Sequence, residues 1–124
     1  MTSRSPSRDA IVAEVGAAGA GVARPGSAAD AIDGVVPSVV ATPATPDALA
    51  KTLAWATETG RTVVVRGGGT KLGWGPPPGP VDLLLSTTAM NAVVKHRHGD
   101  LTATVEAGAT LAETNAVLSR HRQW

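Results

Sequence analysis

The fold of this chain is decided by the stretch VVVRGGGTK at residues 63–71. Its β-branched half is typical of a buried strand, and it runs directly into three glycines. Glycine packs no side chain and loses more backbone entropy on folding than any other residue. Successive backbone amides without side chains can, however, converge on an anion. The stretch therefore predicts a phosphate-binding loop after a strand, with the cations Arg66 and Lys71 on its flanks.

The common phosphate loops do not fit this stretch. A Walker A loop needs Gly-Lys followed by Ser or Thr, whereas Lys71 follows Thr70 and precedes Leu72. A dinucleotide fingerprint needs glycines at its first, third and sixth positions before a helix. Counted from Gly67, the sixth position is Leu72, and the prolines at 76–78 exclude a helix. A flexible turn that binds nothing remains the alternative for a glycine run this short.

Upstream of the loop, the sequence predicts a short strand and then a helix. Valines surround Pro37 within residues 35–40, which favours an edge strand because proline has no amide to donate. Thr45 is the expected N-cap of a helix over residues 46–59, which has proline at its first position. Gly60 is expected to end this helix.

Downstream of the loop, the sequence mixes irregular chain, strands and a helix. Residues 74–80 (WGPPPGP) cannot lie inside a helix or sheet. Residues 81–85 predict another strand, and residues 91–97 and 101–106 predict a hairpin. A T-x-x-E capping box at residues 110–113 opens a last helix. An αβ crossover combined with antiparallel pairing indicates an α+β fold, a small mixed sheet flanked by helices.

The chain is expected to divide into a leader and one domain. Residues 1–34 predict a loosely ordered leader, with a polar tail over residues 1–8 and a short helix over residues 7–18. Residues 22–34 are rich in Gly, Ala and Asp without a clear period, and we expect a loop there. Residues 35–124 form the predicted domain.

Composition excludes several classes of function. A net charge of +1 supports neither a nucleic-acid nor a membrane-surface footprint. The absence of cysteine excludes disulfides and thiolate sites, and no cluster of His, Asp and Glu has the spacing of a metal site. No signal peptide or membrane span is visible, so a cytoplasmic location is expected. His96, His98 and His121 lie among cations and are interpreted as solvated side chains.

Residues 43–108 resemble a known family of flavoproteins. The matching features, in order, are Thr45-Pro46-Asp47, the strand 63–65 with RGGGTK, the strand 81–85 followed by Ser86 and Met90-Asn91, and Val105-Glu106-Ala107-Gly108. Together they resemble the N-terminal subdomain of the FAD-binding domain of the vanillyl-alcohol oxidase/p-cresol methylhydroxylase (PCMH) superfamily. Within it, residues 66–75 are most similar to the FAD-binding subunits of bacterial glycolate oxidases.

The resemblance implies a noncovalent FAD, because Thr70 stands near the position where many relatives carry a flavin-linked His. The backbone amides of residues 67–70 would hold the pyrophosphate, and the Ala107-Gly108 turn would approach the flavin. The full set of implied cofactor-binding residues is Arg66, Gly67, Gly68, Gly69, Thr70, Lys71, Leu72, Trp74, Gly75, Ala107 and Gly108.

The resemblance also implies an activity, oxidation of a 2-hydroxy acid such as glycolate by hydride transfer to flavin. Other oxidase subunits, including an iron-sulfur subunit, are the implied partners. The family's domain continues beyond this sequence, so the chain is expected to be a truncated N-terminal portion that is inactive alone, and its catalytic residues are unknown. A non-catalytic nucleotide- or phosphate-binding module and an interaction fragment remain the alternatives.

Overall fold

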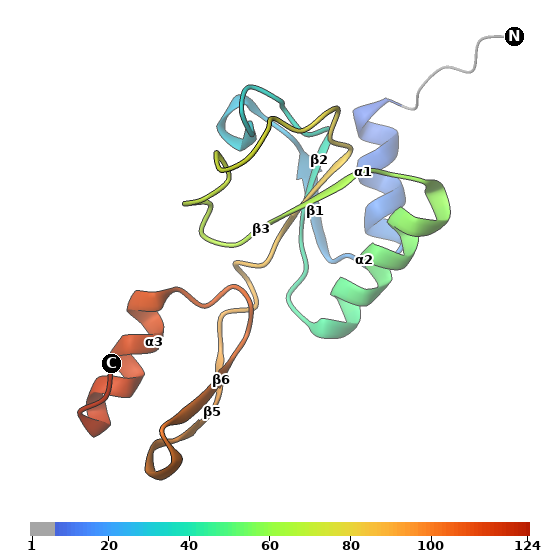
Figure 1. Ribbon diagram of the computed structural model, residues 1–124. Helices are drawn as coiled ribbons and strands as arrows, with labels where there is room; N and C mark the ends of the chain where they lie inside the picture. The colour runs from blue at the N-terminus through green and yellow to red at the C-terminus, as the bar shows by residue number, and fades with distance from the viewer. Residues whose placement is uncertain (1–6) are drawn as a thin grey trace, which may run out of the picture.

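A computed structural model describes residues 7–124 of the chain and shows the expected α+β architecture (Figure 1). In chain order its elements are α1 (Arg8–Ala17), β1 (Val22–Pro25), the 3-10 turn η1 (Ala28–Asp30), β2 (Val39–Thr42), α2 (Pro46–Thr59), β3 (Val63–Arg66), β4 (Leu83–Ser86), β5 (Val93–Arg97), η2 (His98–Asp100), β6 (Thr102–Val105), α3 (Leu111–Leu118) and η3 (Ser119–His121). No helix among these is long and apolar enough to cross a membrane.

Four strands form a mixed sheet in the order β1-β2-β4-β3. Strand β4 pairs in parallel with β2 on one side and β3 on the other, and β1 pairs antiparallel with β2. Helix α2 connects β2 to β3 and leaves between them the position that β4 fills. The three leucines of β4 are almost completely buried, so this strand is the centre of the sheet.

Helix α2 begins and ends where the sequence predicts. The Thr45 hydroxyl accepts a hydrogen bond from the Ala48 amide at 3.1 Å, and Pro46 occupies the first turn. Gly60 ends the helix in the left-handed conformation, with φ of 64°. These caps satisfy backbone groups that a helix end leaves unpaired, and they confirm the predicted helix.

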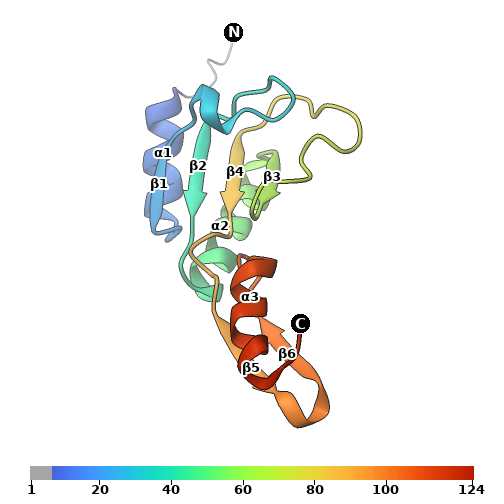
Figure 2. The ribbon, with the colours of Figure 1, turned by 90° about the vertical axis from the view of Figure 1, so that its left-hand side faces the viewer.

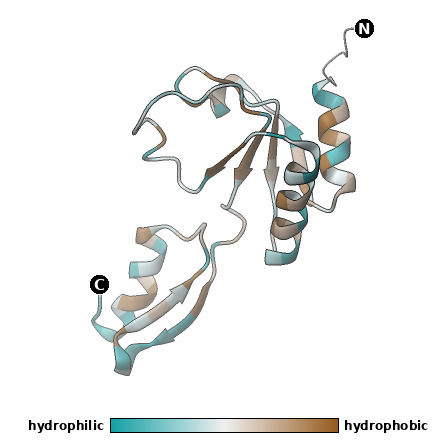
Figure 3. Cartoon of the chain, turned by 45° about the vertical axis from the view of Figure 1, so that its right-hand side comes forward, coloured by the Kyte–Doolittle hydropathy of each residue, from teal (hydrophilic) through white to brown (hydrophobic). Residues whose placement is uncertain are grey.

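The two faces of the sheet are covered differently. Helices α1 and α2 pack on one face through Ile11, Val15, Trp55 and Ala56. The opposite face carries a smaller cluster in which Ile32 packs against two sheet residues, with Leu72 at its margin. Figure 3 shows hydrophobic colour on the inner strands of the sheet, between these layers. The second face is therefore covered by the segment after η1 and by the chain that follows the glycines.

Two predictions about strand position are wrong. Strand β2 was expected at an edge because of Pro37, but this proline precedes the strand, and β2 lies between β1 and β4. Strand β3 was expected to be buried, yet it is the edge strand and Val65 is 55% exposed. A β-branched run predicts a strand equally well at an edge and in the centre, because propensity does not report neighbours.

The loop expected over residues 22–34 is also wrong in part. Strand β1 pairs with β2 across this region, and η1 follows it directly. The polar tail expected at the N-terminus lies mostly in residues 1–6, outside the described part of the chain. The four residues of β1 are too few to show an alternating pattern, and the strand exists because β2 offers it a partner.

The hairpin and the last helix form a separate lobe below the sheet (Figures 1 and 2). Strands β5 and β6 pair antiparallel around η2, as predicted. The capping box of α3 is present, with Thr110 and Glu113 each accepting a hydrogen bond from the other's amide. Strand β6 is exposed along its whole length, so little of this lobe is buried.

The lobe is attached to the sheet through a short hydrogen-bonded connector. The Thr87 amide donates to the Arg66 carbonyl at 2.9 Å, which fastens the chain after β4 to the end of β3. The Gly108 amide donates to the Met90 carbonyl at 2.8 Å. A Cβ atom at Gly108 would overlap the carbonyl groups of Thr87 and Met90. Glycine is therefore required at position 108 for the connector to close.

Replacing Gly108 with alanine should destabilise the protein, because backbone atoms, which cannot rotate away, occupy the space of the new Cβ. We expect a loss of roughly 2 kcal/mol or more in the free energy of unfolding, measured by urea denaturation followed by circular dichroism. Gly99→Ala is the matched control, because a Cβ at Gly99 meets nothing within 4 Å. Equal stability of the two variants would contradict this account of the connector.

Candidate functional site

The glycine run forms an open loop at the carboxyl end of β3. Residues 67–72 line a concavity of about 270 Å³. In open α/β sheets, the crevice beyond the carboxyl ends of parallel strands is the usual place for a ligand. The sequence prediction of a loop between a strand and irregular chain is confirmed, since β3 ends at Arg66 and no helix or strand follows until β4.

The backbone amides of this loop are available for a ligand. None of the amides of residues 67–70 donates a hydrogen bond to another group within residues 7–124. The next amide that is paired in the loop belongs to Trp74, which donates to the Lys71 carbonyl at 3.1 Å. Backbone amides are strong donors that require a partner, either protein, water or ligand. These unpaired amides beside a concavity make the loop a candidate for the predicted anion site.

The three glycines have different local requirements. Gly69 has φ of 77°, in the left-handed region, and its Cβ position lies 3.3 Å from the Arg66 Cδ atom. Gly68 needs neither feature, because a Cβ there would meet nothing within 4 Å in the described structure. The left-handed backbone conformation therefore explains why position 69 is glycine. At position 68 the backbone does not require glycine, and the space that a side chain would occupy is empty.

The Ala107-Gly108 turn lies beside the glycine loop, although some forty residues separate them in sequence. A Cβ at Gly67 would lie 3.7 Å from the Ala107 carbonyl oxygen and 3.6 Å from the Thr87 hydroxyl. The connector between sheet and lobe thus forms one side of the loop. The structure brings these two predicted site segments together, and it adds Thr87, which the sequence did not indicate.

The other predicted site residues continue the loop outward. Leu72 packs against the cluster on the second sheet face. The Lys71 ammonium lies over the Trp74 ring, 4.8 Å from its centroid, a cation–π contact. Trp74 is 77% exposed, and Gly75 follows it with φ of 92°. Only Leu72 in this group is anchored in the core, so it fixes the far end of the loop.

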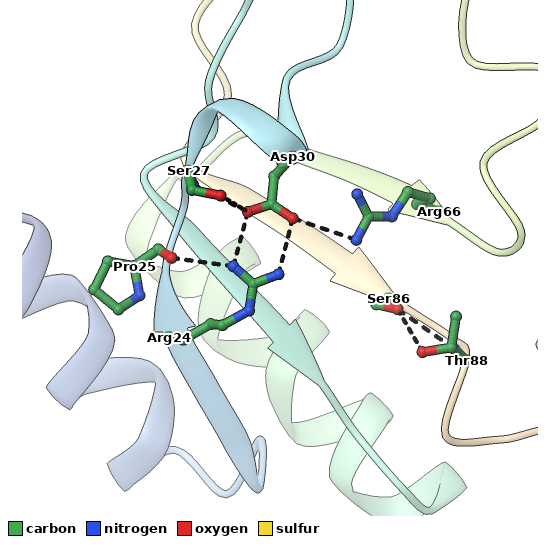
Figure 4. Close-up of polar contacts among 7 residues, drawn as sticks. All are labelled: Arg24, Pro25, Ser27, Asp30, Arg66, Ser86 and Thr88. Atoms are coloured by element: carbon green, nitrogen blue, oxygen red, sulfur yellow. Dashed lines mark hydrogen bonds and ion pairs between the residues drawn. The ribbon is translucent and has the colours of Figure 1, made fainter.

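Behind the loop lies an ion cluster that the sequence did not predict. Arg24 on β1 binds Asp30 with both guanidinium nitrogens, at 2.7 and 2.8 Å. The Asp30 carboxylate also accepts from the amide and hydroxyl of Ser27. Arg66, the residue that opens the glycine run, lies on its other side at 3.5 Å (Figure 4). The segment expected as a leader loop therefore reaches the site.

The charge of Asp30 is stable because of these contacts. The Asp30 residue is 3% exposed, and burial alone would raise the pKa of its carboxyl. The hydrogen bonds from Arg24, with further ones from Ser27, outweigh burial and hold this pKa well below its usual range. Asp30 is thus a buried carboxylate that is charged at neutral pH and shared by two arginines. A lone Asp in a Gly/Ala-rich stretch gives no sequence signal for such a role.

A larger hollow, of about 430 Å³, lies in the lobe. It is lined by Leu101, Thr102, Ala103, Leu118, Arg122, Gln123 and Trp124. No run of unpaired amides comparable to that of residues 67–70 borders it within the described chain. We therefore assign the candidate site to the smaller concavity at the glycine loop, where donors and positive charge coincide.

The three histidines, interpreted from sequence as solvated, gather on the lobe. The His98 and His121 rings stack with centroids 3.9 Å apart and planes inclined by 4°. The His96 ring lies 5.3 Å from His121, and its Nε2 atom shares a hydrogen bond with the Gln123 Oε1 atom at 2.9 Å. No group of three potential metal ligands with suitable geometry occurs in residues 7–124. The cluster joins α3 and its following turn to the hairpin.

Several solved enzyme structures are similar to this fold. Berberine bridge enzyme from Eschscholzia californica is similar with a TM-score of 0.70 and 19% identity, covering 89% of this chain and 26% of its own. p-Cresol methylhydroxylase gives 0.63 at 20% identity, covering 72% and 18%. Alkyldihydroxyacetonephosphate synthase gives 0.60 at 19%, covering 68% and 18%. The fold is that of a PCMH-type FAD-binding domain, and the chain spans about a quarter or less of these proteins.

The family is shown by sequence as well. The model described as "FAD binding domain" matches residues 37–124, and the chain belongs to this family. It is an FAD-binding domain, and its cofactor is FAD. Among curated protein sequences, none matches the chain significantly.

The histidine cluster should make the stability of the protein depend on pH. Partial desolvation in the stack, and then positive charge on His98, His96 and Arg120, lower the pKa of His121. The unfolded chain, whose His pKa is about 6.5, therefore binds more protons than the folded one as pH falls through this range. Because unfolding is then favoured, urea midpoints should be lower at pH 5.5 than at pH 7.5.

His121→Gln is the matched variant for this measurement. It removes the titrating group while a polar side chain remains, so the difference between the two midpoints should shrink. A midpoint difference of the same size in His121→Gln and in the wild type would show that the stack does not cause the pH dependence.

Proposed function

We propose that residues 67–70 hold the pyrophosphate of FAD through their backbone amides. The observation that carries this proposal is the run of four unpaired amides beside a concavity, at the carboxyl end of a parallel strand. Convergent backbone amides bind phosphate groups without any side chain. The two negative charges of a diphosphate also match the cations Arg66 and Lys71 at the two ends of the run.

The remaining residues of the proposed site have supporting roles. Leu72 anchors the far end of the loop on the sheet, and Trp74-Gly75 lies beyond it as an exposed aromatic wall. Ala107 and Gly108 form the opposite side, next to Gly67. A ligand that begins at the amides can extend from here along the connector, toward the lobe. This path suits the elongated cofactor pose that the family resemblance implies.

The reaction that we propose for the whole protein is oxidation of a 2-hydroxy acid such as glycolate. Bound FAD supplies the hydride acceptor, and the protein supplies position and electrostatics. Support comes from the resemblance of residues 66–75 to glycolate oxidase subunits. This chain would contribute the loop that binds the cofactor. The substrate-binding part and an iron-sulfur partner subunit would lie outside it. Glycolate and lactate, assayed with a dye acceptor on the whole protein, test this proposal.

A second candidate function is a non-catalytic phosphate- or nucleotide-binding module. It is favoured by the fact that the visible site consists of the candidate anion-binding loop alone. The flavin spectrum distinguishes the two functions. A purified chain that takes up ADP but no flavin would support the module, whereas a yellow chain with bound FAD would support the first proposal.

Replacing Gly68 with valine should weaken FAD binding without disturbing the fold. A Cβ atom at this position meets nothing within 4 Å in the protein, but the new side chain would stand between the loop amides and the phosphates. We expect the Kd for FAD to rise about tenfold, equivalent to about 1.4 kcal/mol, in a titration followed by flavin fluorescence. Gly79→Val is the control, because Gly79 is equally unobstructed within the same irregular segment. Equal affinities of the two variants would refute the role of the loop.

The FAD should be held noncovalently. The chain has no cysteine and three histidines, and these histidines all lie in the lobe, in or beside the stack. Thr70 stands in the loop instead. Acid precipitation of the FAD-loaded chain should therefore release all flavin into the supernatant, as measured by absorbance. Flavin that remains on the protein through a denaturing gel would contradict this prediction.

A further inference from the structure

Arg66 has a defined place at the start of the glycine loop. Its side chain is 21% exposed, and its Cδ atom lies 3.3 Å from the Cβ position of Gly69. The aliphatic stem of Arg66 therefore runs along the loop rather than away from it. An arginine side chain is flexible and carries about 2 kcal/mol of rotamer entropy when free. A second group must contact the guanidinium if Arg66 is to present it to a ligand in one fixed orientation.

Asp30 is the group that holds it. The carboxylate is almost fully buried and approaches the Arg66 Nη2 atom at 3.5 Å. The neighbouring chain supports this position, since Ile32 packs in the cluster that includes Leu72. Asp33 lies next to Gly73, 3.9 Å from its Cβ position. The segment after β1 thus reaches Arg66 just before the glycine run and Gly73 just after Leu72.

Arg24 keeps this contact from neutralising Arg66. Its two short hydrogen bonds to Asp30, at 2.7 and 2.8 Å, form the bidentate fork that is the strongest arginine–carboxylate arrangement. The Arg66 contact is longer, at 3.5 Å, and involves one nitrogen. Two guanidinium groups share one carboxylate, so the cluster retains a net positive charge. Because Arg24 pairs with the Asp30 carboxylate, the remaining positive charge is that of Arg66.

We propose that Asp30, charge-balanced by Arg24, is a positioning residue that orients Arg66 toward the diphosphate of FAD. This inference rests on the proposed role of the glycine loop. It assigns the segment 22–33 to the cofactor site, and it makes Arg66 an oriented cation in addition to the four amides. The pair Arg24–Asp30 does not touch the ligand and acts through Arg66 alone.

The test is a double-mutant cycle on the full chain. The Kd for FAD is measured by flavin fluorescence at 0.15 M NaCl, where the Debye length of about 8 Å limits long-range charge effects. Inorganic diphosphate serves as a competing probe that lacks the flavin and the adenosine. Asp30→Asn should raise both dissociation constants about fivefold or more, a loss of about 1 kcal/mol. Asp47→Asn removes the same charge from an exposed side chain of helix α2. It should change neither dissociation constant.

The second arm of the cycle separates positioning from stability. In an Arg66→Gln background, Asp30→Asn should cause no further loss of FAD affinity, because the side chain through which it acts is gone. A merely structural role would give the same loss in both backgrounds. Thermal unfolding, measured in parallel, should instead show a destabilisation by Asp30→Asn that persists without Arg66, because Arg24 remains unpaired.

Arg24→Lys provides an independent variant, and it decides the question if Asp30→Asn does not fold. Lysine keeps the charge but cannot form the two parallel hydrogen bonds to Asp30. The Asp30 carboxylate should then pair more closely with Arg66 and neutralise it. FAD affinity should therefore fall again, and only in proteins that contain Arg66. Wild-type affinity in Arg24→Lys, or equal losses with and without Arg66, would overturn the inference. Failure of the wild-type chain to bind FAD and diphosphate would instead overturn the proposed function of the loop.

Discussion

The structure depends on the parallel pairing of β4 with two strands at once. Because β4 lies between β2 and β3, its leucines 83–85 fill both faces of the sheet. This pairing holds β3 at the edge of the sheet with its carboxyl end free, and the glycine loop leaves from that end. It also directs the chain after β4 across the end of β3, where the Thr87 amide meets the Arg66 carbonyl. Loss of this strand would therefore remove the support of both the glycine loop and the connector beside it.

The two faces of the sheet serve different purposes. Helices α1 and α2 cover one face with a conventional apolar layer. The other face carries a small cluster against which a partly buried loop residue, Leu72, packs. The glycine loop is therefore supported by packing at one end, although it has no regular structure. This arrangement leaves the amides of residues 67–70 free of internal partners while the ends of the loop are fixed.

The sequence predicted most of the architecture because its signals were local. The caps of α2 at Thr45 and Gly60, the hairpin, and the capping box of α3 are decided within a few residues, and the structure confirms them. Strand order was not accessible in this way, so β2 and β3 were placed wrongly. The glycine loop was found because three glycines after a strand are rare without a purpose. Asp30 was missed because its role comes from Arg24 and Arg66, which approach it only in the folded chain.

The placement of the three tryptophans has an optical consequence. Trp55 on helix α2 is buried against the sheet, Trp74 is exposed beyond the glycine run, and Trp124 is exposed on the lobe. With no tyrosine in the chain, its near-ultraviolet emission comes from these three indoles alone. Each indole reports on a different region, namely the core, the loop and the lobe. Replacing the tryptophans one at a time would therefore assign the emission of each region without any attached label.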